Sequence, residues 1–131
     1  MTSVLARIRP LPGMTRLGGH HFKEATMYAQ LVYFDGPRST ELLAAADFAA
    51  THRIEPAVAS VAGSIRTYVL RRPDGSEVVL TLAETEQDLL AGRDAIMGTS
   101  LLPGEDPDLL PGPDRVEIYP VHEVFEHGAT S

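Results

Sequence analysis

The sequence predicts one α+β domain with the element order βαββαβ, and three observations support this prediction. Four short segments are rich in β-branched and aromatic residues, which is typical of strands. Two longer segments between them carry apolar residues at helical spacing. The length of 131 residues is close to the commonest size of a single domain, and a hydrophobic content of 44% is sufficient for a core.

The first predicted strand and helix follow each other directly. Residues 27–34, MYAQLVYF, are apolar except for Gln30 and are too few for a helix, so they predict a strand. An Asp-Gly-Pro turn closes it. Ser39 is placed to cap the helix that follows, because its side-chain oxygen can accept a hydrogen bond from the first turn. Pro56 is expected to end or kink that helix at Glu55, since proline lacks the N–H that a helix requires.

Residues 65–71 and 77–83 predict a β-hairpin. They are joined by a Pro-Asp-Gly turn in which Gly75 can adopt the left-handed conformation of a short hairpin loop. A helix is predicted next, because Thr85 is followed three residues later by Asp88, a pattern that resembles a capping box. The hairpin therefore leads into the second helix, 85–97.

The last predicted strand lies within 115–125, after an acidic loop at 99–114. Pro120 cannot donate a hydrogen bond to a neighbouring strand, so this strand should lie at an edge of the sheet or carry a bulge. The complete order βαββαβ is the ferredoxin-like arrangement, a four-stranded antiparallel sheet with two helices on one face.

The strands are apolar on both sides, although two helices can cover only one face of the sheet. A sheet with one wet face alternates apolar and polar residues, whereas AQLVYF and VVLTLA are apolar almost throughout. We therefore expect a homodimer through the second face. Burying about 800 Å² per partner at about 25 cal/mol per Å² gives roughly 20 kcal/mol before the costs of association.

Residues 26–126 are predicted to form this domain, with a flexible arm at 1–25 and a short tail at 127–131. The net charge is −7 although cations outnumber carboxylates in the arm, so the domain itself is strongly acidic. An acidic domain repels phosphate backbones and anionic lipids, so nucleic acid is not an expected partner. No apolar run of about 18 residues predicts a membrane span. The absence of cysteine favours a reducing, cytoplasmic setting.

Three residues are candidates for catalysis. His122 shares a predicted strand face with Val116 and Ile118 and is expected to point toward a buried surface, where it could act as a base or simply be a hydrogen-bonded structural histidine. Arg66 shares a face with Tyr68. Its planar guanidinium could hold an enolate or carboxylate, although a solvated strand arginine is the alternative.

The candidate binding residues are polar interruptions in the strands, strand tyrosines and a pair of loop leucines. The polar ones would need hydrogen-bond partners if buried, so they could line a cavity. The leucines could close over a pocket as a lid or pack on a neighbouring subunit. The set comprises Gln30, Tyr33, Thr67, Thr81, Tyr119, Leu101 and Leu102. No metal site is expected, because the histidines and carboxylates lack a recognised ligand spacing.

The pattern resembles the dimeric α+β barrel superfamily, and within it the antibiotic-biosynthesis-monooxygenase-like proteins. The segments MYAQLVYF and VAGSIRTYVLRRPDGSEVVLTLAE, with the helix after them, carry the resemblance, which covers residues 27–126. It implies paired ferredoxin-like subunits whose sheets close a barrel, each with a pocket between its sheet and helices. Some members oxidise aromatic polyketides without a cofactor, and others degrade haem.

The chain departs from the catalytic sets of those members, because it contains neither Trp nor Asn. The resemblance therefore implies a cofactor-independent monooxygenase-like enzyme that acts on a small apolar or aromatic, polyketide-like compound, with no residue roles carried over. The alternative is a non-catalytic dimer that binds a small molecule or is associated with stress. Haem handling is a third, weaker hypothesis.

Overall fold

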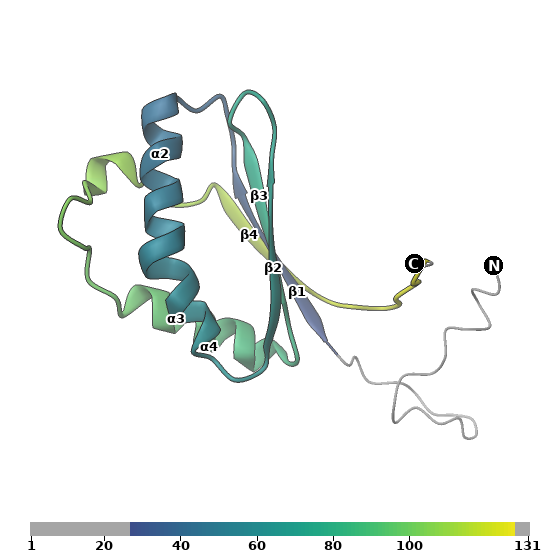
Figure 1. Cartoon of the computed structure of the whole chain (residues 1–131). Coiled ribbons are helices and arrows are strands. Elements are labelled where there is room, and N and C mark those ends of the chain that lie inside the picture. Colours follow the sequence, from purple (N-terminus) through teal and green to yellow (C-terminus); the bar gives the residue numbers. More distant parts are fainter. Residues whose placement is uncertain (1–26, 128–131) are drawn as a thin grey trace, which may run out of the picture.

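The computed structural model describes residues 27–127, so the predicted arm lies outside the described residues and the predicted tail is described only at its first residue. The elements alternate in the predicted order (Figure 1). The strands are β1 (Tyr28–Phe34), β2 (Ser64–Arg71), β3 (Glu77–Ala83) and β4 (Arg115–Pro120). The helices are α2 (Thr40–Ala49), η2 (Ala50–Ile54), α3 (Glu55–Ala59), α4 (Glu86–Met97) and the short η3 (Pro107–Leu109).

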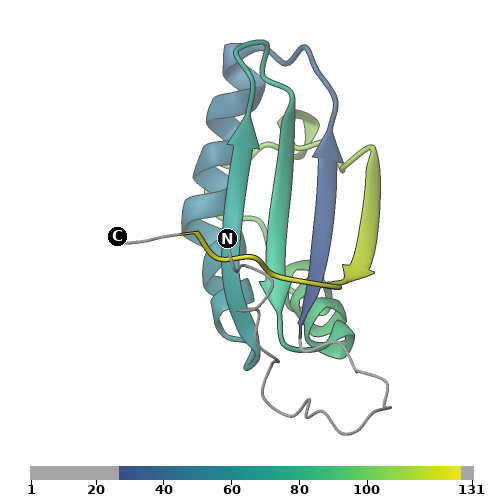
Figure 2. The ribbon, with the colours of Figure 1, turned by 90° about the vertical axis from the view of Figure 1, so that its right-hand side faces the viewer.

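The sheet has four strands in the order β2-β3-β1-β4, and all neighbours are antiparallel. The helices cover one face (Figure 1), and the opposite face is open (Figure 2). The ferredoxin-like prediction is therefore confirmed. Pro120 lies in β4, which is an edge strand, as the missing N–H donor required.

Pro56 does not end the first helix but disturbs it, which is the second of the two predicted outcomes, and the helix passes the proline through a wider turn. Residues 50–54 form a π-helical turn, and the Glu55 N–H donates to the carbonyl of Ala50, five residues earlier. Such a turn relaxes the helix where the proline ring and its missing donor disturb the regular pattern. The helix then continues as α3 to Ala59.

Two predicted caps and one predicted turn are present. The Ser39 hydroxyl accepts a hydrogen bond from the Leu42 N–H, and the Thr85 hydroxyl accepts one from the Asp88 N–H. Gly75 has a φ of +92°, and a Cβ at this position would lie 2.8 Å from the carbonyl oxygen of Arg38. The hairpin turn therefore requires glycine for both conformation and space.

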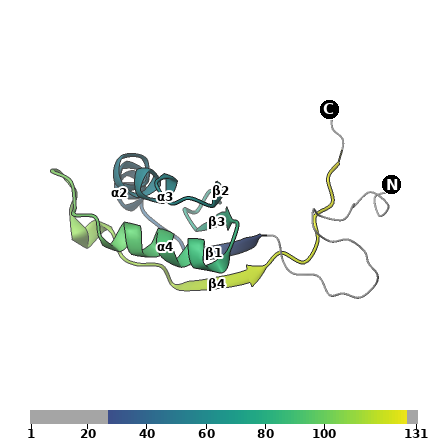
Figure 3. The ribbon, with the colours of Figure 1, turned by 90° about the horizontal axis from the view of Figure 1, so that it is seen from below.

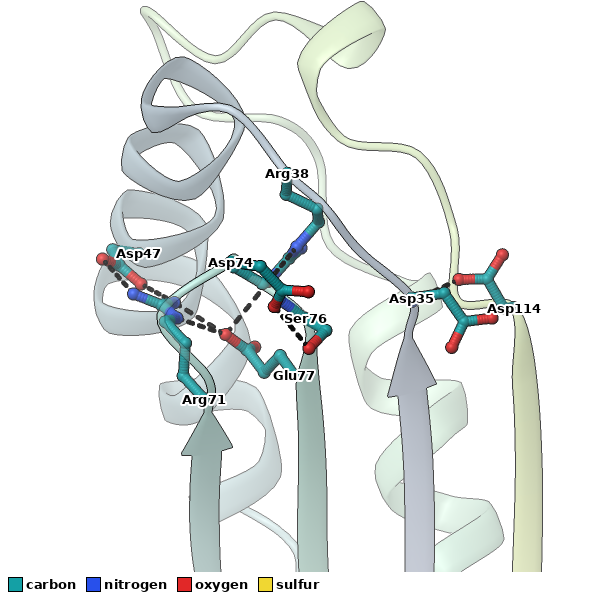
Figure 4. Close-up of polar contacts among 9 residues, drawn as sticks. Asp35, Arg38, Asp47, Arg71, Asp74, Ser76, Glu77 and Asp114 are labelled. Carbon is teal, nitrogen blue, oxygen red and sulfur yellow. Dashed lines mark hydrogen bonds and ion pairs between the residues drawn. The ribbon is translucent and has the colours of Figure 1, made fainter.

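A buried carboxylate joins the β2–β3 hairpin to the first helix (Figure 4). Glu77 is 8% exposed and accepts hydrogen bonds from Arg38 at 3.1 Å and from Arg71 at 2.7 Å. Arg71 also reaches Asp47 in α2 at 2.6 Å, which lowers the pKa of that carboxyl. This network fixes the helix layer over one end of the sheet. At the same end, the Asp35 N–H donates to Asp114, which holds the start of β4.

The subunit has few buried hydrophobic side chains. The buried hydrophobic residues are Ala49, Ala83 and Leu89, and none of the larger side chains is fully buried within residues 27–127. α4 packs on β1, β2 and β3, and Gly92 brings its backbone into the interior. None of the helices within the described part of the chain is both long and apolar enough to cross a membrane.

Candidate functional site

A row of polar side chains crosses the sheet. In the strand registers, Gln30 of β1 lies opposite Thr81 of β3, and Thr81 lies opposite Thr67 of β2. Each is the polar interruption that stood out in its strand. The register thus places three predicted binding residues side by side in adjacent strands.

This row lies on the face that the helices cover. Side chains two or four residues apart in a strand share a face, so Thr67 is on the side of Arg71 and Thr81 is on the side of Glu77. Arg71 contacts Asp47 of α2, which identifies that side as the helix side. The polar row is therefore enclosed between the sheet and the helices.

Gln30 is the most informative member of the row. Its Oε1 is buried and accepts no hydrogen bond from the described residues. Buried polar atoms in folded proteins nearly always have a partner, and an unpaired acceptor costs about 1–3 kcal/mol. Across the strands Gln30 is flanked by Thr81 and Ile118, so an apolar neighbour stands on one side and a hydroxyl on the other.

The predicted pair Arg66 and Tyr68 lies on the open face, away from the polar row. The Arg66 guanidinium donates a hydrogen bond of 2.9 Å to the Tyr68 hydroxyl, and both residues are exposed. In register, Tyr68 lies opposite Leu80, which lies beside Leu31 in β1. These two candidate catalytic residues therefore belong to the rim of an apolar surface.

The tyrosines Tyr33 and Tyr119 also lie on the open face, next to β4 charges. The Arg115 guanidinium lies 3.7 Å from the centre of the Tyr33 ring, which is a cation–π contact. The negative charge of Glu117 raises the pKa of Tyr119, because it disfavours the phenolate. Tyr119 is therefore not poised to act as a base.

His122 does not face a buried surface within its own subunit, and its burial against a second copy stays a prediction. β4 ends at Pro120 instead of continuing to Phe125, because the proline cannot donate to the ladder, so His122 lies beyond the strand. Its side chain is 89% exposed, and its Nε2 lies 4.0 Å from a carboxylate oxygen of Glu123. The strand alternation that suggested a buried position ends before it reaches this residue.

Leu101 and Leu102 lie in a loop that is held in place by hydrogen bonds. Leu101 is exposed, whereas the Leu102 N–H donates to the Glu105 carboxylate at 2.9 Å. Arg53 holds the same carboxylate with two hydrogen bonds of 2.7 and 3.0 Å and also reaches Thr99 at 3.0 Å. These contacts, with the backbone donor, lower the pKa of Glu105.

The sequence did not predict the ion pair between Arg53 and Glu105. Arg53 lies in the π-helical turn, whose wider winding changes the direction of its side chain, and nothing in the local sequence identifies such a turn. Glu105 is only one of several acidic residues in its loop. Among residues 27–127, no three histidine, aspartate or glutamate side chains gather closely enough to hold a metal ion.

Comparison with known proteins shows similarity in structure but not in sequence. No family model matches the chain, and no curated protein matches it. A solved structure described as "Putative antibiotic biosynthesis monooxygenase from Nitrosomonas europaea" is 16% identical, with a TM-score of 0.55 over 78% of this chain and 96% of that one.

A second structure, a dimeric ferredoxin-like protein from an uncultured marine organism, is 10% identical. Its TM-score is 0.51, and the match covers 81% of this chain and 95% of the other. Both matches extend over nearly the whole of the other protein. The resemblance inferred from the strand pattern is thus confirmed at the level of the fold: the chain has the ferredoxin-like fold of the antibiotic-biosynthesis-monooxygenase-like proteins.

Proposed function

We propose that the protein is a homodimer that binds a small apolar or aromatic compound bearing a hydroxyl group between its sheet and its helices. The buried, unpaired Oε1 of Gln30 carries this proposal. A phenol or enol O–H would satisfy that acceptor, and the hydroxyls of Thr67 and Thr81 can exchange donor and acceptor roles with neighbouring oxygens of the same compound. The small residues of the interior support the proposal, because the buried helix residues Ala49 and Gly92 carry no bulky side chain.

The proposed dimer interface is the open face of the sheet. Its centre is apolar, with Leu31 and Leu80 paired across the two middle strands, and the outer strands carry polar residues such as Arg66 and Glu117. An apolar centre with a polar rim is the usual composition of a specific interface. The dimeric ferredoxin-like protein of the same fold supports this assembly.

A second candidate function is oxygenation of the bound compound without a cofactor. It is favoured by the structural match to a protein described as an antibiotic biosynthesis monooxygenase. That chemistry requires removal of the phenol or enol proton, so that the resulting anion can react with oxygen. Glu77 lies on the same face of β3 as Thr81, but its carboxylate is held by Arg38 and Arg71 at the end of the strand.

The candidate base for this second function is still His122. His52, His122 and His127 are all exposed in the subunit, so none lies at the polar row. His122 could act in the reaction only if the second subunit enclosed it. Binding therefore has the stronger geometric support, and catalysis depends on the dimer.

The test compares ligands that differ only in their hydroxyl group. We expect naphthols and hydroxynaphthoquinones to raise the melting temperature of the protein and to bind more tightly than their methyl ethers. In Gln30→Met the preference for the hydroxyl should fall by about tenfold, equivalent to one lost hydrogen bond. Gln87→Met, which changes an exposed glutamine, serves as the matched control and should retain the preference.

Equal binding of phenols and ethers by the unaltered protein would contradict the proposed site. Oxygen consumption with the best-bound compound tests the second function, and His122→Ala should abolish it. Oxygen consumption that persists in His122→Ala would exclude His122 as the base. Sedimentation velocity at micromolar concentration tests the dimer, and a stable monomer would contradict it.

A further inference from the structure

A row of four valines crosses the sheet next to the polar row. In the strand registers, Val79 of β3 lies opposite Val69 of β2 on one side and Val32 of β1 on the other. Val32 in turn lies opposite Val116 of β4. Val32 stands two residues from Gln30 along β1, so the valine row and the polar row lie on the same, helix-covered face. The rings of a compound whose hydroxyl reached Gln30 would lie on this apolar row.

Both ends of the valine row are exposed, although the row lies on the covered face. Val69 is 54% exposed and Val116 is 40% exposed. Val116 lies at the start of β4, immediately after the loop at 99–114. The end of that loop is held at the sheet, where the Asp114 N–H donates to the Tyr33 carbonyl at 2.7 Å. The position of the loop therefore determines how open the β4 end of the row is.

The loop spans the helix layer from α4 to β4. It leaves α4 on the side of the helices away from the sheet (Figures 1 and 3) and returns to the sheet between α2 and β4 (Figure 2). Within it η3 packs on α2. Its half-buried leucines are Leu102, Leu109 and Leu110. The loop thus forms part of the outer wall of the layer that contains the proposed site.

Two Pro-Gly turns divide the loop. We refer to residues 101–112 as the lid, in which the sequence Leu-Leu-Pro-Gly occurs twice, at 101–104 and 109–112. Gly104 has a φ of +94°, and a Cβ at Gly104 or at Gly112 would meet nothing within 4 Å. Glycine in open space lets the backbone turn without a steric clash. These two turns are therefore suited to act as hinges for the segment between them, which carries η3.

One ion pair fastens the lid to the helix layer. Arg53 of η2 donates to both carboxylate oxygens of Glu105, and the two side chains are only 11% and 2% exposed. Among residues 27–127, no other hydrogen bond joins the lid to an element outside the loop. Glu105 directly follows the hinge at Gly104. The closed position of the lid therefore depends on this pair.

We propose that the lid opens and closes over the valine row, and that the Arg53–Glu105 ion pair controls how often it opens. The inference rests on the binding site proposed above. The pair lies in η2 and the loop, outside the polar row, so its loss would raise the open fraction of the empty and of the occupied protein by the same factor. Association and dissociation would accelerate together, and the dissociation constant, which is their ratio, would stay the same.

Stopped-flow fluorescence with 1-naphthol as the probe measures both rate constants. In Arg53→Met we expect kon and koff each to rise roughly tenfold, as for the loss of one charged hydrogen-bonded pair, while Kd changes by less than about twofold. Glu105→Gln, which keeps the size of the side chain, should give the same result. Arg93→Met, which alters an exposed arginine of α4, is the matched control and should leave both rate constants unchanged.

Unchanged rate constants in Arg53→Met and Glu105→Gln, with 1-naphthol still bound, would overturn the lid and leave the binding site intact. A rise in koff alone would also overturn the lid, because that pattern marks a residue that contacts the compound, as we expect for Gln30→Met. An equal rise of both rate constants in Arg93→Met would have the same consequence. Failure of the unaltered protein to bind 1-naphthol would overturn the lid and the proposed site together.

Discussion

Replacing Gln30 by methionine is expected to stabilise the ligand-free protein, although the substitution removes a side chain proposed to bind the ligand. The buried Oε1 of Gln30 has no partner among the described residues, so it has lost its hydration without a compensating hydrogen bond. Methionine has a similar length and shape and brings no polar atom. Residues that serve binding often reduce stability in this way.

The magnitude follows from the cost of an unpaired acceptor, which is about 1–3 kcal/mol. Some of this gain is lost because methionine fits the site imperfectly, so we expect a net increase of about 1 kcal/mol in the free energy of unfolding. For a domain of this size, that corresponds to a rise of about 4 °C in melting temperature.

The assay is urea and thermal unfolding of Gln30→Met beside the unaltered protein. Protein concentration must be fixed, because the melting temperature of a dimer depends on it. Gln87→Met, at an exposed position of α4, should change stability by less than about 0.5 kcal/mol. A loss of 1 kcal/mol or more in Gln30→Met would refute the reasoning, because it would show that the amide makes a structural hydrogen bond.

Three further predictions concern the ion pairs. Arg53→Met should release the loop at 99–114, detected as faster amide hydrogen exchange at Leu102. Unchanged exchange would show that the Arg53–Glu105 ion pair does not hold the loop. Glu77→Ala should lower the free energy of unfolding in urea by about 3 kcal/mol, because it leaves the buried Arg38 without its carboxylate and Arg71 with Asp47 alone, and a loss under 1 kcal/mol would contradict this. Because Arg53 lowers the pKa of Glu105, the stabilisation from this pair is complete above the ordinary value of 4.5 and is lost as the pH falls through the lower folded-state value. Arg53→Met should therefore flatten the dependence of stability on pH in this acidic range, measured by unfolding at a series of pH values; an unaltered slope would contradict the assignment.

The order and type of the elements could be predicted from the sequence, because the signals are local. Ser39 and Thr85 cap the helices that follow them through hydroxyls only three residues from their donors. Gly75 is required by the conformation of its own turn. The apolar character of both strand faces predicted an open sheet face, and this too is a property of short segments. Gln30 was recognisable as a candidate because one polar residue in an apolar strand is visible without a structure.

The assembly of the site was decided only by the tertiary structure. Strand order and register bring Gln30, Thr67 and Thr81 into one row, and the same register places Arg66 and Tyr68 on the other face. The pairing of Arg53 with Glu105 joins segments 52 positions apart, through a π-helical turn. Local periodicity determines which residues can share a face of one strand or helix. Which strands become neighbours, and where each strand ends, depends on contacts between distant segments, so the sequence alone determined the candidate residues and the fold determined which of them meet.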